Sequence, residues 1–293
     1  MCRVREIVIV SGKGGTGKTS LVAALATLLQ SKVVADCDVD AANLNLILNG
    51  TVTEEHEFIG GKKAQIDPKR CSACGKCREL CRFDAISEDF VVDPFACEGC
   101  GACFFFCPAQ AVVFSETLAG HLYVGEVNGA FPIVFAELLP GGENSGKLVT
   151  AVRTKARSLT ETNGKKLILV DGPPGIGCPV ISSLTGASLA VMVTEPTMTG
   201  IHDLERVVGL TRHFQIPATV VINKGDINPH YAKSIAGFCE THDLSLLGTI
   251  PYDIQITEAQ RQGKTILEFA PDSRASSEIL AVSKKLKERM EAL

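Results

Sequence analysis

Two runs of four cysteines limit what this chain can fold into. The first run is Cys71-x2-Cys74-x2-Cys77-x3-Cys81, and the second is Cys97-x2-Cys100-x2-Cys103-x3-Cys107. The runs repeat as larger units at a period of 26, from IDPKRCSACGKCRELCRFDAIS to VDPFACEGCGACFFFCPAQAVV. Thiolates two and three residues apart can converge on one inorganic centre. The sequence therefore predicts a duplicated module with two metal centres.

This spacing resembles that of two-cluster bacterial ferredoxins, in which the fourth cysteine of each run binds the other cluster. Paired Cys-x2-Cys units also form tetrahedral zinc sites, and zinc stays open as the alternative. A disulfide framework is disfavoured because nothing in the sequence indicates secretion. The ferredoxin resemblance implies two [4Fe-4S] clusters with crossed ligand sets, namely Cys71, Cys74, Cys77 and Cys107 for one, and Cys97, Cys100, Cys103 and Cys81 for the other.

The composition is typical of a globular protein. Of 293 residues, 45% are hydrophobic and 21% are charged, enough core for one large domain or two smaller ones. The formal net charge of -4 gives no reason to expect nucleic acid as a partner. The opening segment MCRVREIVIV is too short for a signal peptide, and no apolar stretch is long enough to span a membrane. We therefore expect a cytoplasmic protein.

Residues 12–19, GKGGTGKT, match the phosphate-loop pattern G-x4-GK[ST] between a predicted strand and a predicted helix. In such a loop the backbone N–H groups close on the phosphates, and the helix presents its positive end. Lys18 adds a positive charge, and the Thr19 hydroxyl is expected to bind Mg²⁺. The predicted nucleotide-binding residues are Gly12, Lys13, Gly14, Gly15, Thr16, Gly17, Lys18, Thr19 and Ser20.

A second lysine in this loop, Lys13, narrows the family. The string KGGxGK resembles the deviant Walker A motif of the MinD/ParA/Mrp and nitrogenase iron-protein group of P-loop NTPases. The segments DCDVDAANLNL and LVDGPPGIG resemble the first and second switches of that group. The chain is thus identified as a MinD/ParA/Mrp-superfamily ATPase with an inserted two-cluster ferredoxin domain. The resemblance implies a nucleotide-dependent homodimer in which Lys13 reaches the phosphates across the subunit interface.

Four aspartates lie in these two switch segments. Asp171 and Asp36 each end an apolar strand, where a carboxylate commonly holds the water shell of Mg²⁺. Asp38 matches the family residue that orients the attacking water, and Asp40 is a nearby competitor. Together with Lys13 and Lys18, Asp38 is the predicted catalytic residue.

Two further residues match family positions around the base of the nucleotide. Asn223 in VVINKGD resembles the asparagine that contacts the base, and Pro251 in GTIPYD lies where the adenine pocket closes. NKxD strings also occur in GTP-binding proteins. ATP is therefore favoured by the resemblance and not by the residues alone.

Short apolar runs that alternate with helical patterns predict an α/β fold with a doubly wound, mostly parallel sheet. The cysteine module, residues 66–114, is expected to be an inserted small α+β ferredoxin-like domain. The ATPase domain would then be discontinuous, with residues 1–65 and 115–293. Residues 119–146 are expected to form hairpins or loops. The predicted strands are residues 6–10, 33–36, 167–171, 190–194, 219–223 and 247–250.

Isolated cysteines lie outside the two runs. Cys178 lies seven residues after Asp171, where the second switch of the nitrogenase iron protein places a cluster ligand. One cysteine per subunit supplies only half the ligands of a bridging cluster. A core or surface thiol is therefore the favoured interpretation of Cys178, and the same holds for Cys37 and Cys239.

The C-terminal segment, residues 276–293, has an apolar helical face. MinD proteins end in a basic amphipathic membrane anchor, which is one interpretation of this face. We favour a last helix packed on the sheet, so membrane association is not expected. The face comprises Ile279, Val282, Leu286, Met290 and Leu293.

Three functions fit these features. In the first, ATP hydrolysis by a dimer gates electron transfer through the clusters to a redox or metallocofactor partner protein. The second is a metallocofactor or iron–sulfur assembly factor resembling Mrp-type carriers, although their C-terminal Cys-x2-Cys is absent here. The third is a MinD-like spatial switch in cell division, with redox-sensing clusters. The first is favoured because eight ligands in a ferredoxin arrangement suit stable electron carriage.

Overall fold

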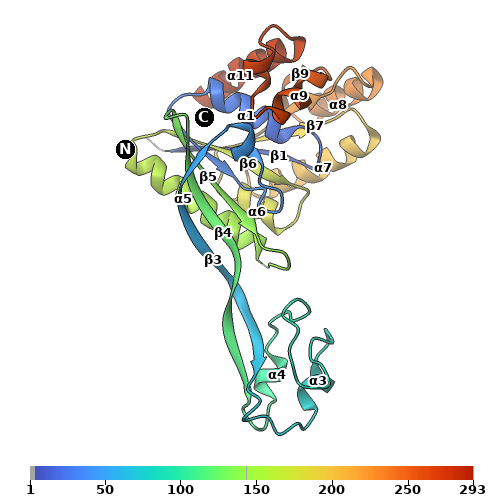
Figure 1. Ribbon diagram of the computed structural model, residues 1–293. Coiled ribbons are helices and arrows are strands. Elements are labelled where there is room, and N and C mark those ends of the chain that lie inside the picture. Colours follow the sequence, from blue (N-terminus) through green and yellow to red (C-terminus); the bar gives the residue numbers. More distant parts are fainter. Residues whose placement is uncertain (1–3, 143, 293) are drawn as a thin grey trace. The chain divides into compact units, whose positions relative to one another are not determined.

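The computed structural model describes residues 4–142 and 144–292. Within them, nine strands form one sheet in the order β3-β4-β5-β2-β6-β1-β7-β8-β9 (Figure 1). The chain divides into two compact units, a nucleotide unit (Met1–His56, Leu122–Glu137 and Ser145–Leu293) and a cysteine unit (Glu57–His121 and Leu138–Asn144). Strands β3 and β4 each cross the unit boundary in the sequence. The strands are β1 (Arg5–Ser11), β2 (Lys32–Asp36), β3 (Thr51–Ile66), β4 (Val112–Val127), β5 (Phe131–Leu138), β6 (Leu167–Pro174), β7 (Leu189–Thr194), β8 (Ala218–Asn223) and β9 (Ser245–Ile250).

The centre of the sheet is parallel, from β5 and β2 through to β9. Strands β1, β2 and β7 are almost wholly buried, as expected for parallel strands covered on both faces. Asp36 pairs with Asp171 across β2 and β6, and Asn223 pairs with Ile250 across β8 and β9. The carboxyl ends of parallel strands meet at one edge of a sheet, where ligands bind in such folds. The register thus collects the predicted nucleotide residues at one edge.

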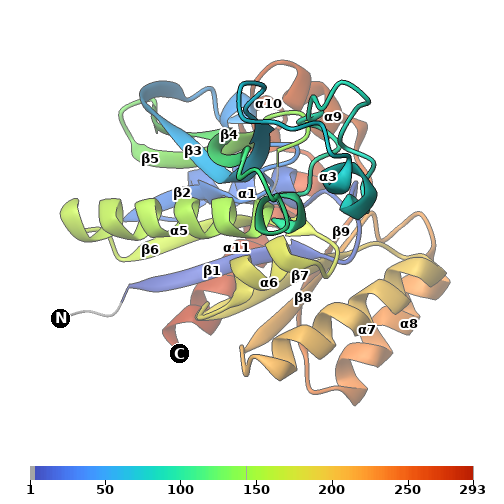
Figure 2. The ribbon, with the colours of Figure 1, turned by 90° about the horizontal axis from the view of Figure 1, so that it is seen from below.

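Helices cover both faces of the sheet in the nucleotide unit. Helices α5, α6, α7 and α8 lie on one face, and α1, α10 and α11 lie on the other (Figure 2). The core formed by β1, α1 and α11 includes Ile7, Leu25 and Leu286. The helices are α1 (Lys18–Leu28), α2 (Leu44–Ile47), α3 (Lys76–Leu80), α4 (Ala102–Phe105), α5 (Ser145–Thr162), α6 (Cys178–Leu184), α7 (Met198–His213), α8 (Pro229–Thr241), α9 (Ile254–Arg261), α10 (Ile266–Phe269) and α11 (Arg274–Glu291).

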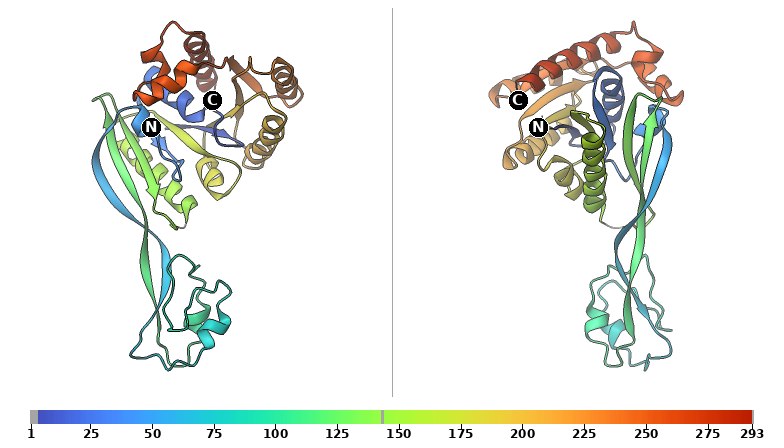
Figure 3. Two further views of the ribbon diagram at one scale, coloured as in Figure 1. Left: turned by 45° about the vertical axis from the view of Figure 1, so that its right-hand side comes forward. Right: turned by 90° about the vertical axis from the view of Figure 1, so that its left-hand side faces the viewer.

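The last helix, α11, packs against the sheet. Ile279, Val282 and Leu286 are buried in the core, and Met290 packs against it. The red helix in the right-hand view of Figure 3 is α11. The expectation of a packed last helix is confirmed, except for Leu293, which lies outside the described residues. In the described part of the chain, no helix combines the length and apolar character needed to cross a bilayer.

The predicted α/β sheet is confirmed, and all six predicted strands coincide with observed ones. Residues 119–146 contain the end of β4, a tight turn at Asn128 and Gly129, and β5, so this region joins the sheet directly. The sequence did not predict β3. Strands β3 and β4 are paired neighbours, and the compact cysteine unit includes parts of both, from Glu57 and up to His121. The bounds 66–114 of an inserted domain stay a prediction.

Candidate functional site

The phosphate loop joins β1 to α1 and leaves no room for larger residues at two of its glycines. A Cβ on Gly12 would lie 2.3 Å from the Cβ of Asp203 in α7. Gly17 has φ 87°, and a Cβ there would lie 2.2 Å from Nδ2 of Asn223. Lys18 begins α1 and is only 5% exposed. The loop's chain path therefore depends on glycine, as close approach to phosphates requires.

Two residues at the end of β8 brace this loop. The Asn223 amide donates from Nδ2 to the Thr16 carbonyl at 2.8 Å, and Nζ of Lys224 donates to the Gly15 carbonyl at 3.0 Å. The Asn223 side chain also accepts from the Lys224 N–H at 3.0 Å through Oδ1. The structure thus shows a loop-supporting contact for Asn223. Its base contact, like that of buried Pro251 after β9, stays a prediction.

Asp36 ends β2, and Asp171, its register partner, lies within β6; both are buried. Oδ1 and Oδ2 of Asp36 accept from the N–H groups of Asp38 and Leu44 at 3.1 and 3.0 Å. Burial and the charge of Asp171 raise the pKa of Asp36 well above its usual range. Burial raises the pKa of Asp171 to about 6, although the Lys18 charge opposes the shift. Two buried carboxylates side by side form an acidic site that a cation would stabilise.

This acidic site fits Mg²⁺. Neither carboxylate oxygen of Asp171 has a hydrogen-bond partner, and Thr19 lies close enough to lower the Asp171 pKa. Hard oxygen donors of this kind are the ligands that Mg²⁺ prefers. The three predicted magnesium residues, Asp171, Asp36 and Thr19, therefore lie near one another.

The two candidates for the residue that orients the attacking water differ in burial. Asp38 is half-buried, whereas Asp40 is exposed. Burial raises the pKa of Asp38 and the Lys18 charge lowers it, which places Asp38 beside the phosphate-binding lysine.

Asp171→Asn is expected to stabilise the magnesium-free protein at neutral pH. The folded-state pKa of about 6 exceeds the unfolded value of about 3.9, so the charged carboxylate costs the folded state about 3 kcal/mol. This cost is absent below about pH 4 and complete above about pH 6. Urea denaturation in EDTA from pH 4 to 8 should show a stability gain for the variant that grows with pH. Asp40→Asn, at an exposed carboxylate, is the control, and the same gain there would contradict the explanation.

The predicted cysteines surround two cavities in the cysteine unit. The first cavity, of about 10 Å³, is lined by Cys71, Cys74 and Cys77 of the first run and by Cys107 of the second. The second cavity, of about 20 Å³, is lined by Cys97, Cys100 and Cys103 of the second run and by Cys81 of the first. Each cavity thus takes three thiols from one run and the fourth from the other.

The duplication in the sequence extends to the backbone of this unit. Gly75 and Gly101, which are 26 residues apart, precede α3 and α4 with φ 78° and 84°. The two halves also exchange hydrogen bonds. The Asp67 N–H donates to the Ala111 carbonyl, and the matching Asp93 N–H donates to the Ala85 carbonyl, both at 2.8 Å. The halves are therefore interlocked, as the crossed cysteine sets require.

The donor set of each cavity suits a cluster that binds thiolates. Burial alone raises the pKa of Cys107, but the N–H groups of Ala111 and Ala109 outweigh it and lower the pKa. The Ala111 N–H lies 3.3 Å from Sγ of Cys107. Among the described residues, no three His, Cys, Asp or Glu side chains are placed to share one metal ion. Four thiols at each cavity are a soft donor set of the kind that binds an iron–sulfur cluster or a zinc ion.

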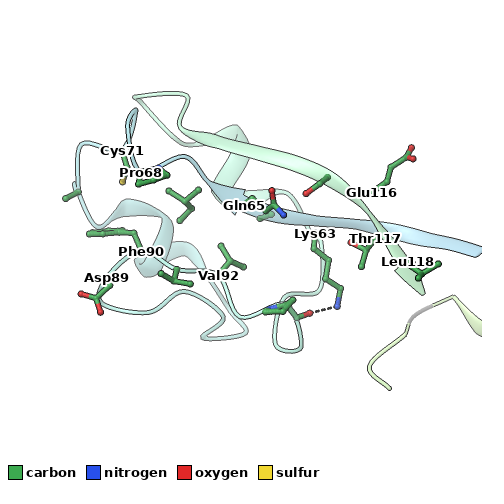
Figure 4. A pocket seen from close by; sticks show the side chains of 16 residues that line it. Lys63, Gln65, Pro68, Cys71, Asp89, Phe90, Val92, Glu116, Thr117 and Leu118 are labelled. Atoms are coloured by element: carbon green, nitrogen blue, oxygen red, sulfur yellow. Dashed lines mark hydrogen bonds between the residues drawn. The ribbon is translucent and has the colours of Figure 1, made fainter. Parts of the chain in front are cut away.

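A larger open hollow of about 810 Å³ lies beside Cys71 in the same unit (Figure 4). Strands β3 and β4 form one side of it, and residues 89–94 form another. Lys63 reaches across and donates to the Pro94 carbonyl at 2.6 Å. Phe90, Val92 and Leu118 line it, and Cys71 is the one cysteine of the first set among its lining residues.

The isolated cysteines and Ser20 differ in burial and contacts. Cys37 and Cys239 are buried, and burial raises the pKa of both. Cys178 is exposed at the start of α6. The Ser20 hydroxyl accepts from Gln260 of α9 at 2.7 Å, so it contributes to tertiary packing. Sequence reasoning missed Glu195 and Lys224, whose only local signal is that each follows an apolar strand at the edge that carries the site.

Comparison with known proteins agrees with this geometry. The family model for the CobQ/CobB/MinD/ParA nucleotide binding domain matches residues 7–266. An uncharacterized protein of Methanocaldococcus jannaschii is 33% identical over 288 residues, 97% of each chain. The iron-sulfur cluster carrier protein of Aquifex aeolicus is 26% identical over 159 residues, which cover 50% of this chain and 44% of the carrier. The structure of septum site-determining protein MinD with Mg-ADP from Pyrococcus horikoshii has a TM-score of 0.58 at 18% identity, covering 96% of this chain and 95% of that one. With its braced phosphate loop and parallel sheet, the chain belongs to the CobQ/CobB/MinD/ParA family of nucleotide-binding ATPases.

Proposed function

We propose that this protein is an Mg²⁺-dependent ATPase whose nucleotide state controls electron transfer through two [4Fe-4S] clusters to a redox or metallocofactor partner protein. The observation that carries this proposal is the pair of cavities, each lined by four cysteines in crossed sets, in a chain with a braced phosphate loop. A phosphate loop alone would support a switch, and cysteine cavities alone would support an electron carrier. The presence of both in one chain supports a protein that couples its nucleotide state to electron transfer.

On the nucleotide side, the loop N–H groups and Lys18 would bind the phosphates. Asp36 and Asp171 would hold Mg²⁺ with the Thr19 hydroxyl, which relieves the two buried charges. Asp38 would orient the attacking water, since it is half-buried and senses the charge of Lys18. Lys13 would reach phosphates across a nucleotide-dependent homodimer.

On the cysteine side, the first cavity's four thiolates would hold one cluster and the second cavity's four would hold the other. A [4Fe-4S] cluster bound there supplies one-electron transfer. Cys77 and Cys103 lie in the short helices α3 and α4, and the other six cysteines lie in the adjoining loops. The backbone donates an N–H group to at least one thiol, that of Ala111 to Cys107. Ala64, Ala85, Cys97 and Val112 form a buried apolar cluster of the unit, and Cys81, Cys103 and Cys107 pack against it.

The chain path offers a way to couple the two sides. Oδ2 of Asp36, a proposed magnesium ligand, accepts from the Leu44 N–H at the start of α2. Helix α2 ends at Ile47, and β3 begins at Thr51 and continues into the cysteine unit. A change in the coordination of Asp36 would therefore act on the short helix that leads into this strand.

The gating is tested by anaerobic reconstitution, reduction with dithionite and stopped-flow reoxidation by a viologen. We expect the reoxidation rate to differ several-fold between Mg-ATP and Mg-ADP. In Lys18→Met, which should not bind phosphate tightly, the two rates should be the same. Equal rates in the wild type would contradict gating, while iron analysis and ATPase assays would test the two halves of the proposal separately.

A second candidate is an iron–sulfur assembly factor. It is favoured by the similarity to the iron-sulfur cluster carrier protein of Aquifex aeolicus over half of this chain. Electron carriage predicts clusters that stay bound when an apo-ferredoxin is added. Transfer of iron and sulfide to that acceptor within minutes would favour the assembly function instead.

A further inference from the structure

A partly buried carboxylate that the nucleotide chemistry does not use lies beside the phosphate loop. Glu195 directly follows β7, and its side chain is only 15% exposed. Its Oε1 accepts from Nζ of Lys13, and its Oε2 accepts from Nζ of Lys224 at 3.1 Å. Hydrogen bonds from both lysines lower the pKa of Glu195 although burial alone would raise it. One carboxylate thus pairs with two ammonium groups.

The two ion pairs differ in what else their lysines do. Lys224 also donates to the Gly15 carbonyl, and its neighbour Asn223 holds the Thr16 carbonyl. These contacts brace the loop without any help from Lys13. The Lys13 ammonium, by contrast, is paired with Glu195, and the Lys13 side chain is one-third exposed. The Glu195–Lys13 pair is therefore not needed to hold the loop in place.

Lys224 also lowers the free-energy cost of breaking the ion pair between Lys13 and Glu195. Removing the partner of a buried charge is strongly destabilising when it leaves that charge unpaired. When Lys13 leaves, Glu195 keeps its bond to Lys224, so no carboxylate is left unpaired. A phosphate offers Lys13 several charged oxygens in exchange. The arrangement suits a lysine that changes partners.

We propose that Glu195 is a positioning residue that binds the Lys13 side chain in the nucleotide-free protein. Its carboxylate competes with nucleotide phosphate for the Lys13 ammonium. Lys224 neutralises the carboxylate once Lys13 has moved. The inference rests on the proposed ATP binding and extends it, since it makes the cost of freeing Lys13 a determinant of nucleotide affinity. The γ-phosphate is the expected competitor, so triphosphate binding should be affected more than diphosphate binding.

The test is calorimetric titration with a non-hydrolysable ATP analogue and with ADP. Glu195→Gln keeps the shape of the side chain and removes its charge, and it should bind the analogue about fivefold more tightly, the effect of about 1 kcal/mol for a partly exposed ion pair. The gain should be smaller for ADP. It should disappear in the Lys13→Met background, where there is no ammonium to release. Glu205→Gln, at an exposed position of α7, is the matched control and should bind as the wild type does.

A second variant guards against loss of folding in Glu195→Gln. Lys224→Met leaves Lys13 as the sole cation on Glu195, so it should bind the analogue more weakly than the wild type. The proposal is overturned if Glu195→Gln binds no more tightly, if its gain persists without Lys13, or if Lys224→Met binds as tightly as the wild type. A wild-type protein that does not bind the analogue would instead contradict the proposed ATP binding.

Discussion

Replacing Cys71 with alanine is expected to leave about four iron atoms per chain in place of about eight, and replacing Cys107 should remove the same four. The reason is that both thiols line the first cavity although they belong to different runs. Each substitution removes one of four ligands from that cavity, and the second cavity keeps its own set. Iron and sulfide analysis after anaerobic reconstitution measures the result.

Double variants distinguish crossed from uncrossed sets. Cys71→Ala with Cys107→Ala should be no worse than either substitution alone, because both remove ligands from one cavity. Cys71→Ala with Cys81→Ala should lose nearly all the iron, because Cys81 lines the other cavity. Uncrossed ligation gives the opposite result for the two pairs. Cys239→Ala, at a buried thiol away from both cavities, is the control and should keep the full iron content.

Replacing Lys18 with methionine is expected to lower ATPase kcat/KM by about 100-fold or more, the usual effect of removing one charge that stabilises a transferring phosphoryl group. Lys18 is buried at the start of α1, and its charge acts on both Asp38 and Asp171. Without the Lys18 ammonium, the phosphates would lie near the carboxylates of Asp36, Asp38 and Asp171 with no fixed positive charge at this position. Phosphate release measured over a range of ATP concentrations, with Mg²⁺ in excess, gives kcat/KM for both proteins.

Lys147→Met is the matched control for this prediction, since it removes one exposed lysine from α5. It should retain wild-type activity. A thermal melt of Lys18→Met separates loss of chemistry from loss of fold. An active, folded Lys18→Met protein would contradict the assignment of Lys18 to the phosphates.

Sequence periodicity was sufficient for the parallel core and insufficient for the strands that enter the cysteine unit. Buried strands such as β1 and β7 are continuous apolar runs, so their pattern is unambiguous. The sequence of β3, TVTEEHEFIGGKKAQI, is mostly exposed and polar. Its strand conformation depends on pairing with β4, a segment that begins 46 residues after β3 ends, and single-sequence patterns do not contain that information.

The site was predictable to the extent that its residues are contiguous. The phosphate loop and the cysteine runs are fixed spacings that can be recognised in one line of sequence. The pairing of Glu195 with Lys13 and Lys224 joins the ends of two strands to a loop about 200 residues away, so only the fold reveals it. Asn223 illustrates the same limit, because its Nδ2 contact with Thr16 depends on the order of strands in the sheet.

The bracing of the phosphate loop has a consequence for the entropy of binding. Fixing one residue's backbone costs about 1 to 2 kcal/mol. In this protein the carbonyls of Gly15 and Thr16 are already held by Lys224 and Asn223. The loop is thus ordered when the chain folds and not when nucleotide arrives. Nucleotide association should therefore be fast and little limited by loop rearrangement, and the free energy of phosphate contacts remains available to drive the switch.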